Sequence, residues 1–285
     1  MTNGLWRVAM PGGSRLARGP VDSGPRELLA GDVTVGGLLA AGSPGLADLE
    51  TLPAAGTVPS DVRRLPPLDD QPVWAAGVTF ERSRAARMEE SHGADIYERV
   101  YGAERPEIFF KAMPGASRGP DEEIGIRSDS TWDVPEPELG IVADASGRAV
   151  AYVVGNDLSS RSIEGENPLY LPQAKIWEGS CAVGPCLVPA AGAPPLDAMT
   201  IALAVRRAGE VVCSDRVELA RMRRGVDDLL SWLFRAQRFP RGVVLLTGTS
   251  IVPDPDFTLR EGDEVEITAT GLGSLVNVVR PVEAV

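Results

Sequence analysis

The chain has 285 residues, of which 44% are hydrophobic, and carries a formal net charge of −12 at pH 7. The acidic balance argues against nucleic acid or an anionic membrane as a partner. No apolar run approaches the ~18 residues that a membrane-spanning helix needs, and the N-terminus lacks the pattern of a signal peptide, so we expect a cytoplasmic protein.

The 31 glycines and 24 prolines, with few aromatic residues, indicate many turns and therefore a β-rich α+β fold. Residues 1–65 are predicted to form a small N-terminal domain, with a strand at LWRVAM and a proline-broken linker at DLETLPAAGTVPSDVRRLPPLDDQP. Residues 66–285 are predicted to form the main domain. The three cysteines have no metal-site spacing, so they are expected to be reduced, packed thiols.

The main domain is expected to open with a short strand, PVWAAGVTF, and a helix over residues 81–101 that is broken at His92-Gly93. The following strand, EIFFKA, places Glu107 and Lys111 on one face, because side chains alternate across a strand. A single glutamate on a strand is most often a surface residue, so spacing alone gives Glu107 no role.

A central hairpin is predicted from ELGIVAD, the turn ASG and the returning strand RAVAYVVGND. Glu136 and Glu138 are two residues apart, so in an extended strand they share a face. If the hairpin folds about Ser146, Asp157 returns to within one residue of Glu136. Three carboxylates would then converge on one point.

Two readings of these acids remain open. Most Glu-x-Glu pairs are solvated acids on an exposed strand, and Pro135 and Pro137 predict that this end of the strand lies at a sheet edge. Alternatively, three carboxylates without a nearby histidine or cysteine suit a hard cation such as Mg²⁺, which is bound by oxygen at about 2.0–2.1 Å. Zinc or copper would want nitrogen or sulfur ligands.

A polar loop follows Asp157, and such loops often carry function on a rigid scaffold. Arg161 could pair with Asp157 or Glu164, or could hold a substrate carboxylate as a bidentate fork. Lys175 would have a lowered pKa if it lay desolvated beside a dication, and it could then act as a base or an acid.

The last third is expected to contain a hairpin at TIALAVRRAGEVVCSD, an amphipathic helix at GVDDLLSWLFRAQ and a buried strand, RGVVLLTGTS, that ends at Thr249. The run EGDEVEITATGLGSLVNVV supplies the final strands. If the substrate is an acid, its site must be a local positive island in an acidic protein. The candidates for this charge are the metal and five basic residues, Arg82, Arg84, Arg87, Lys111 and Lys175.

Three segments together, PEPELGIV, GNDLSSR and QAKIWEGSCAVGP, resemble the core of the fumarylacetoacetate hydrolase superfamily. The C-terminal run from LLTGTSIVPDPDF to GLGSLVNVV resembles its closing section, so the likeness covers roughly residues 66–285. The resemblance implies a mixed β-sandwich roll or barrel with a small N-terminal domain, assembled as a homodimer. It further implies metal ligands at Glu136, Glu138 and Asp157, with Lys175 beside the metal and Thr249 on the substrate carboxylate.

One motif departs from the family. Many members carry G-x-N-Y-x-x-H-x-x-E, but Ser83 and Ala86 stand where the catalytic histidine and glutamate belong, which argues against C–C hydrolysis. The runs GVTFERSRAARMEESHGADIYERVYGAERPEIFFKA and IEGENPLYLPQAK are similar to the sugar-acid branch, typified by 2-keto-3-deoxy-arabinonate dehydratase. This likeness implies that Glu107 is near the substrate, with Ser83 and Arg84 as substrate contacts.

The expected function is Mg²⁺-dependent dehydration of a 2-keto-3-deoxy sugar acid, a pentonate, through a metal-stabilised enolate. Glu107 or Lys175 would remove the C3 proton, and Mn²⁺ or Ca²⁺ could replace Mg²⁺. A hydrolase or decarboxylase of acylpyruvates or oxaloacetate is the alternative. A third reading is a catalytically idle relative that binds a ligand or a partner.

Overall fold

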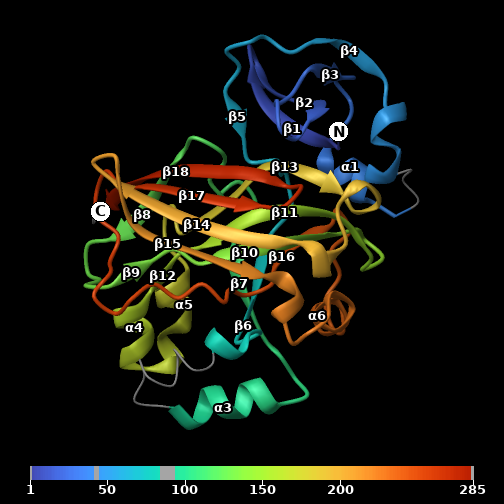
Figure 1. The fold of residues 1–285 in the computed structure, drawn as a ribbon. Coiled ribbons are helices and arrows are strands. Elements are labelled where there is room, and N and C mark those ends of the chain that lie inside the picture. Colours follow the sequence, from blue (N-terminus) through green and yellow to red (C-terminus); the bar gives the residue numbers. More distant parts are fainter. Residues whose placement is uncertain (1, 42–44, 84–93, 284–285) are drawn as a thin grey trace.

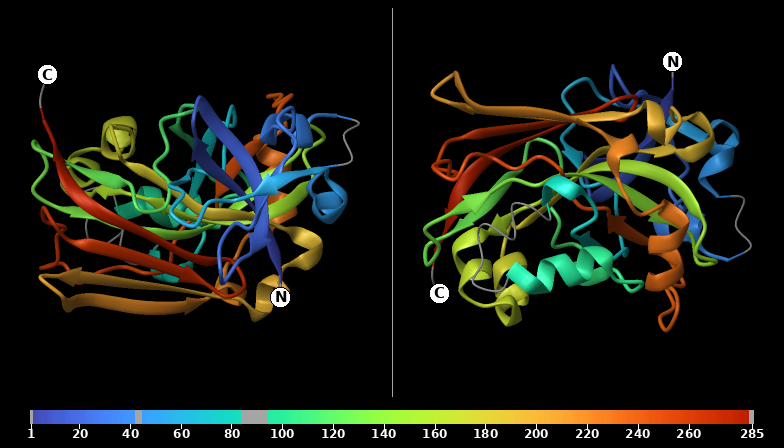
Figure 2. Two further views of the ribbon diagram at one scale, coloured as in Figure 1. Left: turned by 90° about the horizontal axis from the view of Figure 1, so that it is seen from above. Right: turned by 60° about the horizontal axis from the view of Figure 1, so that its bottom comes forward.

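The computed structural model describes residues 2–41, 45–83 and 94–283. Two large β-sheets stack on each other, with short helices at one end and the N-terminal strands at the other (Figure 1). Seen from above, the C-terminal strands form one layer and the central strands the other (Figure 2). This confirms the predicted β-rich sandwich, and neither described sheet closes into a barrel.

The larger sheet has eleven strands in the order β4-β3-β2-β1-β13-β11-β10-β16-β6-β7, with β5 paired to β1. Its strands are β1 (Asn3–Met10), β2 (Gly13–Pro20), β3 (Glu27–Leu29), β4 (Ala54–Thr57), β5 (Arg64–Leu65), β6 (Val73–Gly77), β7 (Glu107–Ala112), β10 (Pro137–Ala143), β11 (Ala149–Asp157), β13 (Cys181–Pro189) and β16 (Val243–Leu246). The pairing is antiparallel except for β16 with β6.

The smaller sheet has the order β15-β14-β17-β18-β8. Its strands are β8 (Glu123–Arg127), β14 (Thr200–Arg207), β15 (Glu210–Glu218), β17 (Glu264–Ala269) and β18 (Gly273–Val282). Strands β14 and β17 alternate between buried apolar and partly exposed side chains, as a sheet covered on one face requires. The buried side chains meet the larger sheet in a shared core, which includes Leu139, Val154, Ile201, Leu203, Ile267 and Leu275.

Short elements flank the sandwich. Strands β9 (Asp133–Val134) and β12 (Ser159–Ser160) pair with each other. The helices are α1 (Val35–Leu39), α3 (Ala94–Gly102), α4 (Arg161–Glu166), α5 (Leu171–Lys175) and α6 (Val226–Leu233). Single 3-10 turns occur at Leu46–Thr51, Pro168–Tyr170, Ala190–Gly192, Leu196–Ala198 and Leu219–Arg221. Helix α6 packs its apolar stripe against the larger sheet, as predicted.

The central hairpin differs from its prediction in two ways. Strand β10 is buried along its whole length rather than exposed; β16 pairs with it over Gly140–Ala143, and among the described strands its proline end pairs with β11 alone. A bulge at Val142 and Ala143 also shifts the register by one residue, so that Glu136 rather than Pro135 lies level with Asp157. The Asp157 amide donates to the Glu136 carbonyl at 3.0 Å.

The N-terminal strands continue the larger sheet, because β1 pairs with β13. Core residues such as Leu5 and Leu29 pack in one cluster with Val142 and Val244. The predicted linker was wrong in part, since it contains β4 and β5, whose backbones pair with β3 and β1 between the prolines. The boundary at residue 65 remains a prediction.

Helix α3 begins at Ala94, and the expected helix break at His92 lies outside the described residues. All three cysteines are free, as predicted. Burial raises the pKa of the Cys181 thiol to about 12 and that of Cys213 to about 11, so both stay protonated and unreactive. Within the described ranges, no helix is long and apolar enough to cross a membrane.

Candidate active site

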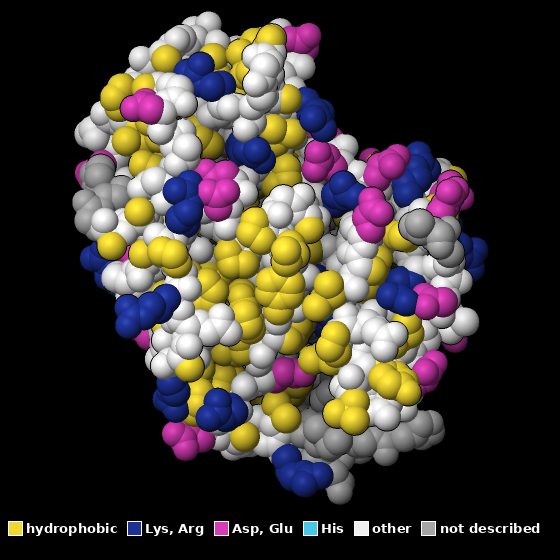
Figure 3. Space-filling model, turned by 180° about the vertical axis from the view of Figure 1, so that it is seen from behind, with side chains coloured by type: hydrophobic (Ala, Val, Ile, Leu, Met, Phe, Trp, Pro, Cys, Tyr) yellow, Lys and Arg dark blue, Asp and Glu magenta, His cyan; other side chains and the backbone are white. Residues whose placement is uncertain are grey.

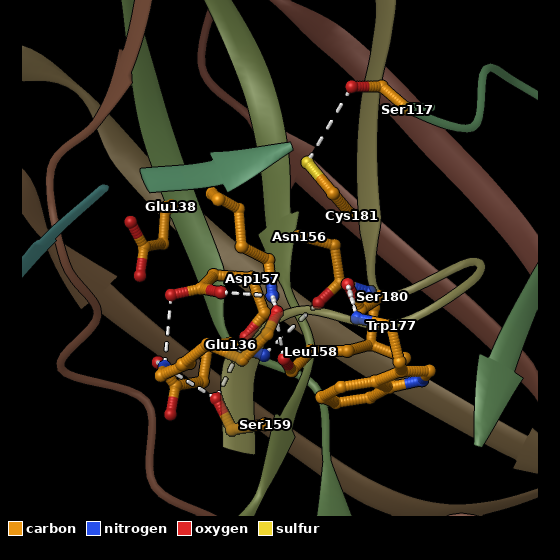
Figure 4. A network of polar contacts seen from close by, with 12 residues as sticks. Ser117, Glu136, Glu138, Asn156, Asp157, Leu158, Ser159, Trp177, Ser180 and Cys181 are labelled. Carbon is orange, nitrogen blue, oxygen red and sulfur yellow. Dashed lines mark hydrogen bonds and ion pairs between the residues drawn. The ribbon is translucent and has the colours of Figure 1, made fainter. Parts of the chain in front are cut away.

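Three carboxylates converge at the end of the central hairpin. Glu136, Glu138 and Asp157 each place one oxygen within 4.8 Å of the others, and all three are at least 97% buried. Figure 4 shows the three side chains turned toward one another from β10, β11 and the segment just before β10. The alternative of solvated acids on an exposed strand is therefore wrong.

Two lysines neutralise this cluster from different positions. The Lys175 ammonium donates to Glu136 Oε2 at 2.8 Å, Asp157 Oδ2 at 2.9 Å and Ser159 Oγ at 2.5 Å. Lys111 Nζ lies 2.6 Å from Asp157 Oδ1. The two carboxylate oxygens of Asp157 are thus divided between two lysines.

Arg161 provides a third positive charge. Its Nη2 lies 2.9 Å from Glu136 Oε1, and its side chain is 3% exposed. Three buried cations therefore face three buried carboxylates. Buried charges need such opposite charges nearby, because their attraction offsets the loss of hydration. A dication entering the cluster would leave a net positive site, suited to an anionic substrate.

Glu138 accepts a hydrogen bond of 2.7 Å from the Gly248 amide through Oε2. Gly248 has φ of +87°, and a Cβ there would overlap Thr79, so only glycine fits this turn. The same turn ends β16 at Leu246, earlier than predicted. Burial, followed by repulsion from Asp157 and Glu136, raises the pKa of Glu138 well above its ordinary value. A bound cation would reverse this shift by favouring the carboxylate.

The donor set fits an oxygen-seeking dication. Each ligand is a carboxylate, no histidine or thiol belongs to the group, and the acids meet at one point. This chemistry is that of Mg²⁺, Mn²⁺ or Ca²⁺ rather than zinc. Hydrogen bonds hold the segment around Glu136 in place before any ion binds. For example, the Asn156 amide oxygen accepts from the Glu136 backbone N–H at 3.1 Å.

A small pocket of about 20 Å³ adjoins the cluster. It is lined by Ala76, Gly77, Val78, Ser83, Glu107, Phe109, Glu136, Glu138, Asp157, Glu164, Leu171, Lys175, Gly248 and Thr249. Seven of the nine predicted site residues are in this lining. Of the other two, Arg161 contacts Glu136, and Arg84 lies outside the described residues.

Glu107 comes to the pocket from β7, opposite Gly77 of β6. A side chain at position 77 would overlap the Glu107 carboxylate, so the glycine provides the space for this acid. Ser83 and Thr249 are buried here as well, at 9% and 4% exposure. Ser83 Oγ donates to the Phe80 carbonyl at 2.8 Å, in the position where many family members have histidine.

The structure adds three groups that were not among the predicted site residues. Lys111 touches Asp157, Ser159 accepts from Lys175, and the buried Glu164 lines the pocket. Strand periodicity had placed Lys111 on the same face as Glu107, which was the available signal. Ser159 and Glu164 lie in the segment after Asp157 that was predicted to be a loop but forms β12 and α4. Its sequence has no repeating pattern to indicate which side chains point inward.

Comparison with known proteins defines the class. Residues 77–280 match the family described as "Fumarylacetoacetate (FAA) hydrolase C-terminal". The chain belongs to the fumarylacetoacetate hydrolase family, and the carboxylate cluster lies within the matched region.

Within that family, two of the similar proteins are named as sugar-acid dehydratases. The "Probable 2-keto-3-deoxyxylonate dehydratase" of Haloferax volcanii is 50% identical over 216 residues, covering 76% of this chain and 74% of the relative. The 2-dehydro-3-deoxy-D-arabinonate dehydratase of Saccharolobus solfataricus is 42% identical over 225 residues, covering 78% of this chain and 76% of the relative.

A solved structure supports the same assignment over nearly the whole chain. It is described as "2-keto-3-deoxy-D-arabinonate dehydratase complexed with magnesium and 2,5-dioxopentanoate". The likeness has a TM-score of 0.84 at 34% identity and covers 98% of this chain and 99% of that chain. The N-terminal strands are therefore part of the shared architecture.

Proposed function

We propose that this protein is a Mg²⁺-dependent lyase that removes water from a 2-keto-3-deoxy sugar acid, with a pentonate as substrate. The observation that carries the proposal is the buried carboxylate cluster with Lys175, beside a pocket that also contains Glu107. The two dehydratases named above match about three quarters of the chain.

Glu136, Glu138 and Asp157 would hold the cation, which supplies a Lewis acid for the carboxylate and C2 carbonyl oxygens of a 2-oxo acid. Thr249, in the same pocket, would donate its hydroxyl to the substrate carboxylate. The pocket is closely surrounded by buried side chains, so we expect its lining to rearrange when a five-carbon acid enters.

Glu107 and Lys175 would move the protons. Glu107 takes a proton from C3, and Lys175 donates one to the C4 hydroxyl, which leaves as water. The C3–H and C4–O bonds break while a double bond forms between C3 and C4. Transfer of one C5 hydrogen to C3 then gives an enol, and transfer of its hydroxyl proton to C4 gives a 2,5-dioxo acid. This is the class of compound bound in the related solved structure.

The runner-up function is hydrolysis or decarboxylation of acylpyruvates or oxaloacetate. Ser83 argues against hydrolysis, because a hydroxyl bonded to the Phe80 carbonyl cannot replace a histidine base that activates water. The serine is instead a neutral group, suited to contact with a substrate hydroxyl.

The deciding experiment is turnover of 2-keto-3-deoxypentonates in Mg²⁺ and in EDTA, with detection of the dioxo acid. Water loss that depends on the metal supports the proposal, and Mn²⁺ and Ca²⁺ are then compared as replacements. Absence of turnover while Mg²⁺ still binds would reject the sugar-acid assignment. Acylpyruvates and oxaloacetate would then test the runner-up.

We further propose a homodimer in the cytoplasm. Apolar side chains gather across the middle of one face (Figure 3). Separately, Met113 and Ile176 are 63% and 38% exposed and border a hollow of about 450 Å³, the kind of surface that a second copy covers. The free thiols fit a reducing compartment. Light scattering tests the dimer, with Met113→Glu expected to yield monomer.

A further inference from the structure

Lys111 and Lys175 are the only lysines in a chain with 28 lysine and arginine residues, so every other side-chain cation of this class is arginine. Both lysines contact Asp157, one on each carboxylate oxygen. Arginine therefore supplies this charge throughout the rest of the chain, and both lysines lie at the proposed metal site.

We propose that Lys111 is a positioning residue of this site: it fixes the Asp157 carboxylate and the backbone of Lys175, so that a metal ligand and a catalytic ammonium are held in register. The inference rests on the proposed function, because it assumes that the carboxylate cluster binds a divalent cation.

The contacts of Lys111 show how one ammonium can do this. Its Nζ lies 2.6 Å from Asp157 Oδ1 and donates to the Leu158 carbonyl at 2.9 Å and to the Lys175 carbonyl at 2.5 Å. The three acceptors come from two segments, the end of β11 and the end of α5. Lys111 thus joins these segments at one atom, and Figure 4 shows Asp157 and Leu158 within the resulting polar network.

Burial separates the roles of the two lysines. Lys111 has no exposed surface and is not among the residues that line the Glu107 pocket, whereas Lys175 lines it. Lys111 also lies 5.4 Å from the centre of the Trp177 ring, which further restricts its movement. Because its ammonium is already held by two carbonyls and the Asp157 carboxylate, Lys111 acts on the reaction through Asp157 and Lys175.

Lysine is required here for geometric reasons. An ammonium directs three donors tetrahedrally from one atom, while a guanidinium directs its donors in a plane from a longer, rigid fork. Lys111 Nζ reaches all three oxygens from one atom, through two hydrogen bonds and one ion pair. Replacement by arginine would keep the charge but lose the simultaneous contacts, so charge and positioning can be tested separately.

The test is calorimetric titration of Mg²⁺ into the metal-free wild-type protein, Lys111→Met, Lys111→Arg and Lys175→Met. Simple electrostatics predicts that removing either lysine tightens Mg²⁺ binding, because a positive charge leaves the cluster. Positioning predicts the opposite sign for position 111: Mg²⁺ binds about 10–100-fold more weakly to both of its variants, as for other residues that orient metal ligands. Lys175→Met should bind Mg²⁺ as tightly as wild type or more tightly.

Each outcome decides one point. Unchanged or tighter Mg²⁺ binding in a folded Lys111→Met or Lys111→Arg protein would overturn the inference. A wild-type protein that binds no Mg²⁺ would instead overturn the proposed function. Circular dichroism and thermal melting identify variants that fail to fold.

A measurement on the wild-type protein needs no variant at position 111. With ¹⁵N-labelled lysine only two side-chain signals arise, and Lys175→Met assigns them. Lys111 should keep a slowly exchanging ammonium signal when Mg²⁺ is added, while the Lys175 signal shifts. Loss of the Lys111 signal on adding Mg²⁺ would show that it leaves Asp157, contrary to the proposal.

Discussion

Two regions of the sandwich treat charged residues in opposite ways. On the smaller sheet, Arg206 pairs with Glu264 and Glu266 at 3.4 and 2.8 Å, with side chains that are 28–47% exposed. At the end of the central hairpin, Glu136 meets Arg161 and Lys175 at similar distances, but every partner is at most 4% exposed.

The difference lies in the cost of removing a partner. Water replaces a lost partner at an exposed pair, which makes such pairs nearly neutral to stability. In the buried cluster no water can do so, and an unpaired charge is strongly destabilising. A set of charges maintained at that cost, around a small pocket, is typical of a site in use.

Glu136→Gln tests the buried cluster of charges and has the largest expected effect. The change removes a metal ligand and leaves Arg161 and Lys175 without a shared carboxylate. We expect Mg²⁺ binding and turnover to fall below detection, and the free energy of unfolding to fall by about 3–5 kcal/mol while the protein still folds. Calorimetry, dehydratase assays and urea unfolding measure the three effects. Full activity in a Glu136→Gln, Glu138→Gln double variant would refute the metal site.

Lys175→Met separates chemistry from metal binding. The methionine keeps much of the side-chain volume but cannot donate a proton, so turnover should fall by about 10²–10⁴-fold. Mg²⁺ binding should remain, because the three carboxylates are unchanged. Steady-state kinetics at saturating Mg²⁺ gives the result, and an unaffected kcat would remove Lys175 from the mechanism.

Asp133 sharpens the comparison because it is buried and forms no ion pair with any cation that the structure describes. Its Oδ1 has no hydrogen-bond partner among the described residues. Burial raises its pKa from 3.8 to about 6, against smaller opposing effects of Ser130 and Arg127. A carboxyl whose pKa is higher in the folded state stabilises the fold fully below pH 3.8, and this contribution is lost as the pH rises through about 6.

Asp133→Asn should therefore flatten the decline in stability between pH 4 and pH 7. At pH 8 we expect a gain of about 1–2 kcal/mol over wild type, since the uncharged side chain needs no counter-ion. Urea unfolding at pH 4.5 and at pH 8 makes the measurement. A variant that is less stable than wild type at both pH values would contradict the assignment of a buried, repelled carboxylate.

Glu266→Gln tests the exposed ion pairs on the smaller sheet and has the smallest expected effect. Arg206 keeps Glu264 and water as partners, so we expect turnover, Mg²⁺ affinity and the midpoint of thermal unfolding to match wild type. It serves as the matched control for Glu136→Gln, with the same chemical change in a different environment. A loss of stability comparable to that of Glu136→Gln would remove the distinction between the exposed and the buried ion pairs.

Several features of the fold followed from local pattern. Alternating apolar residues identified the hairpin of β14 and β15, and the apolar stripe of α6 was read directly from its spacing. Both signals are short-range, because strand and helix periodicity fix which side chains share a face. The carboxylate cluster was also reached from the sequence, through strand spacing and family motifs together.

Tertiary structure decided the rest. No local pattern indicated that β16 would pair with β10 and bury Glu138, nor that a bulge would bring Glu136 level with Asp157. The contacts of Lys111 with Asp157, Leu158 and Lys175 join residues 46 to 64 positions apart along the chain. Sequence by itself determined which side chains could act as acids, bases and ligands. Long-range strand pairing determined which of them met away from water, because burial depends on neighbours that local spacing does not specify.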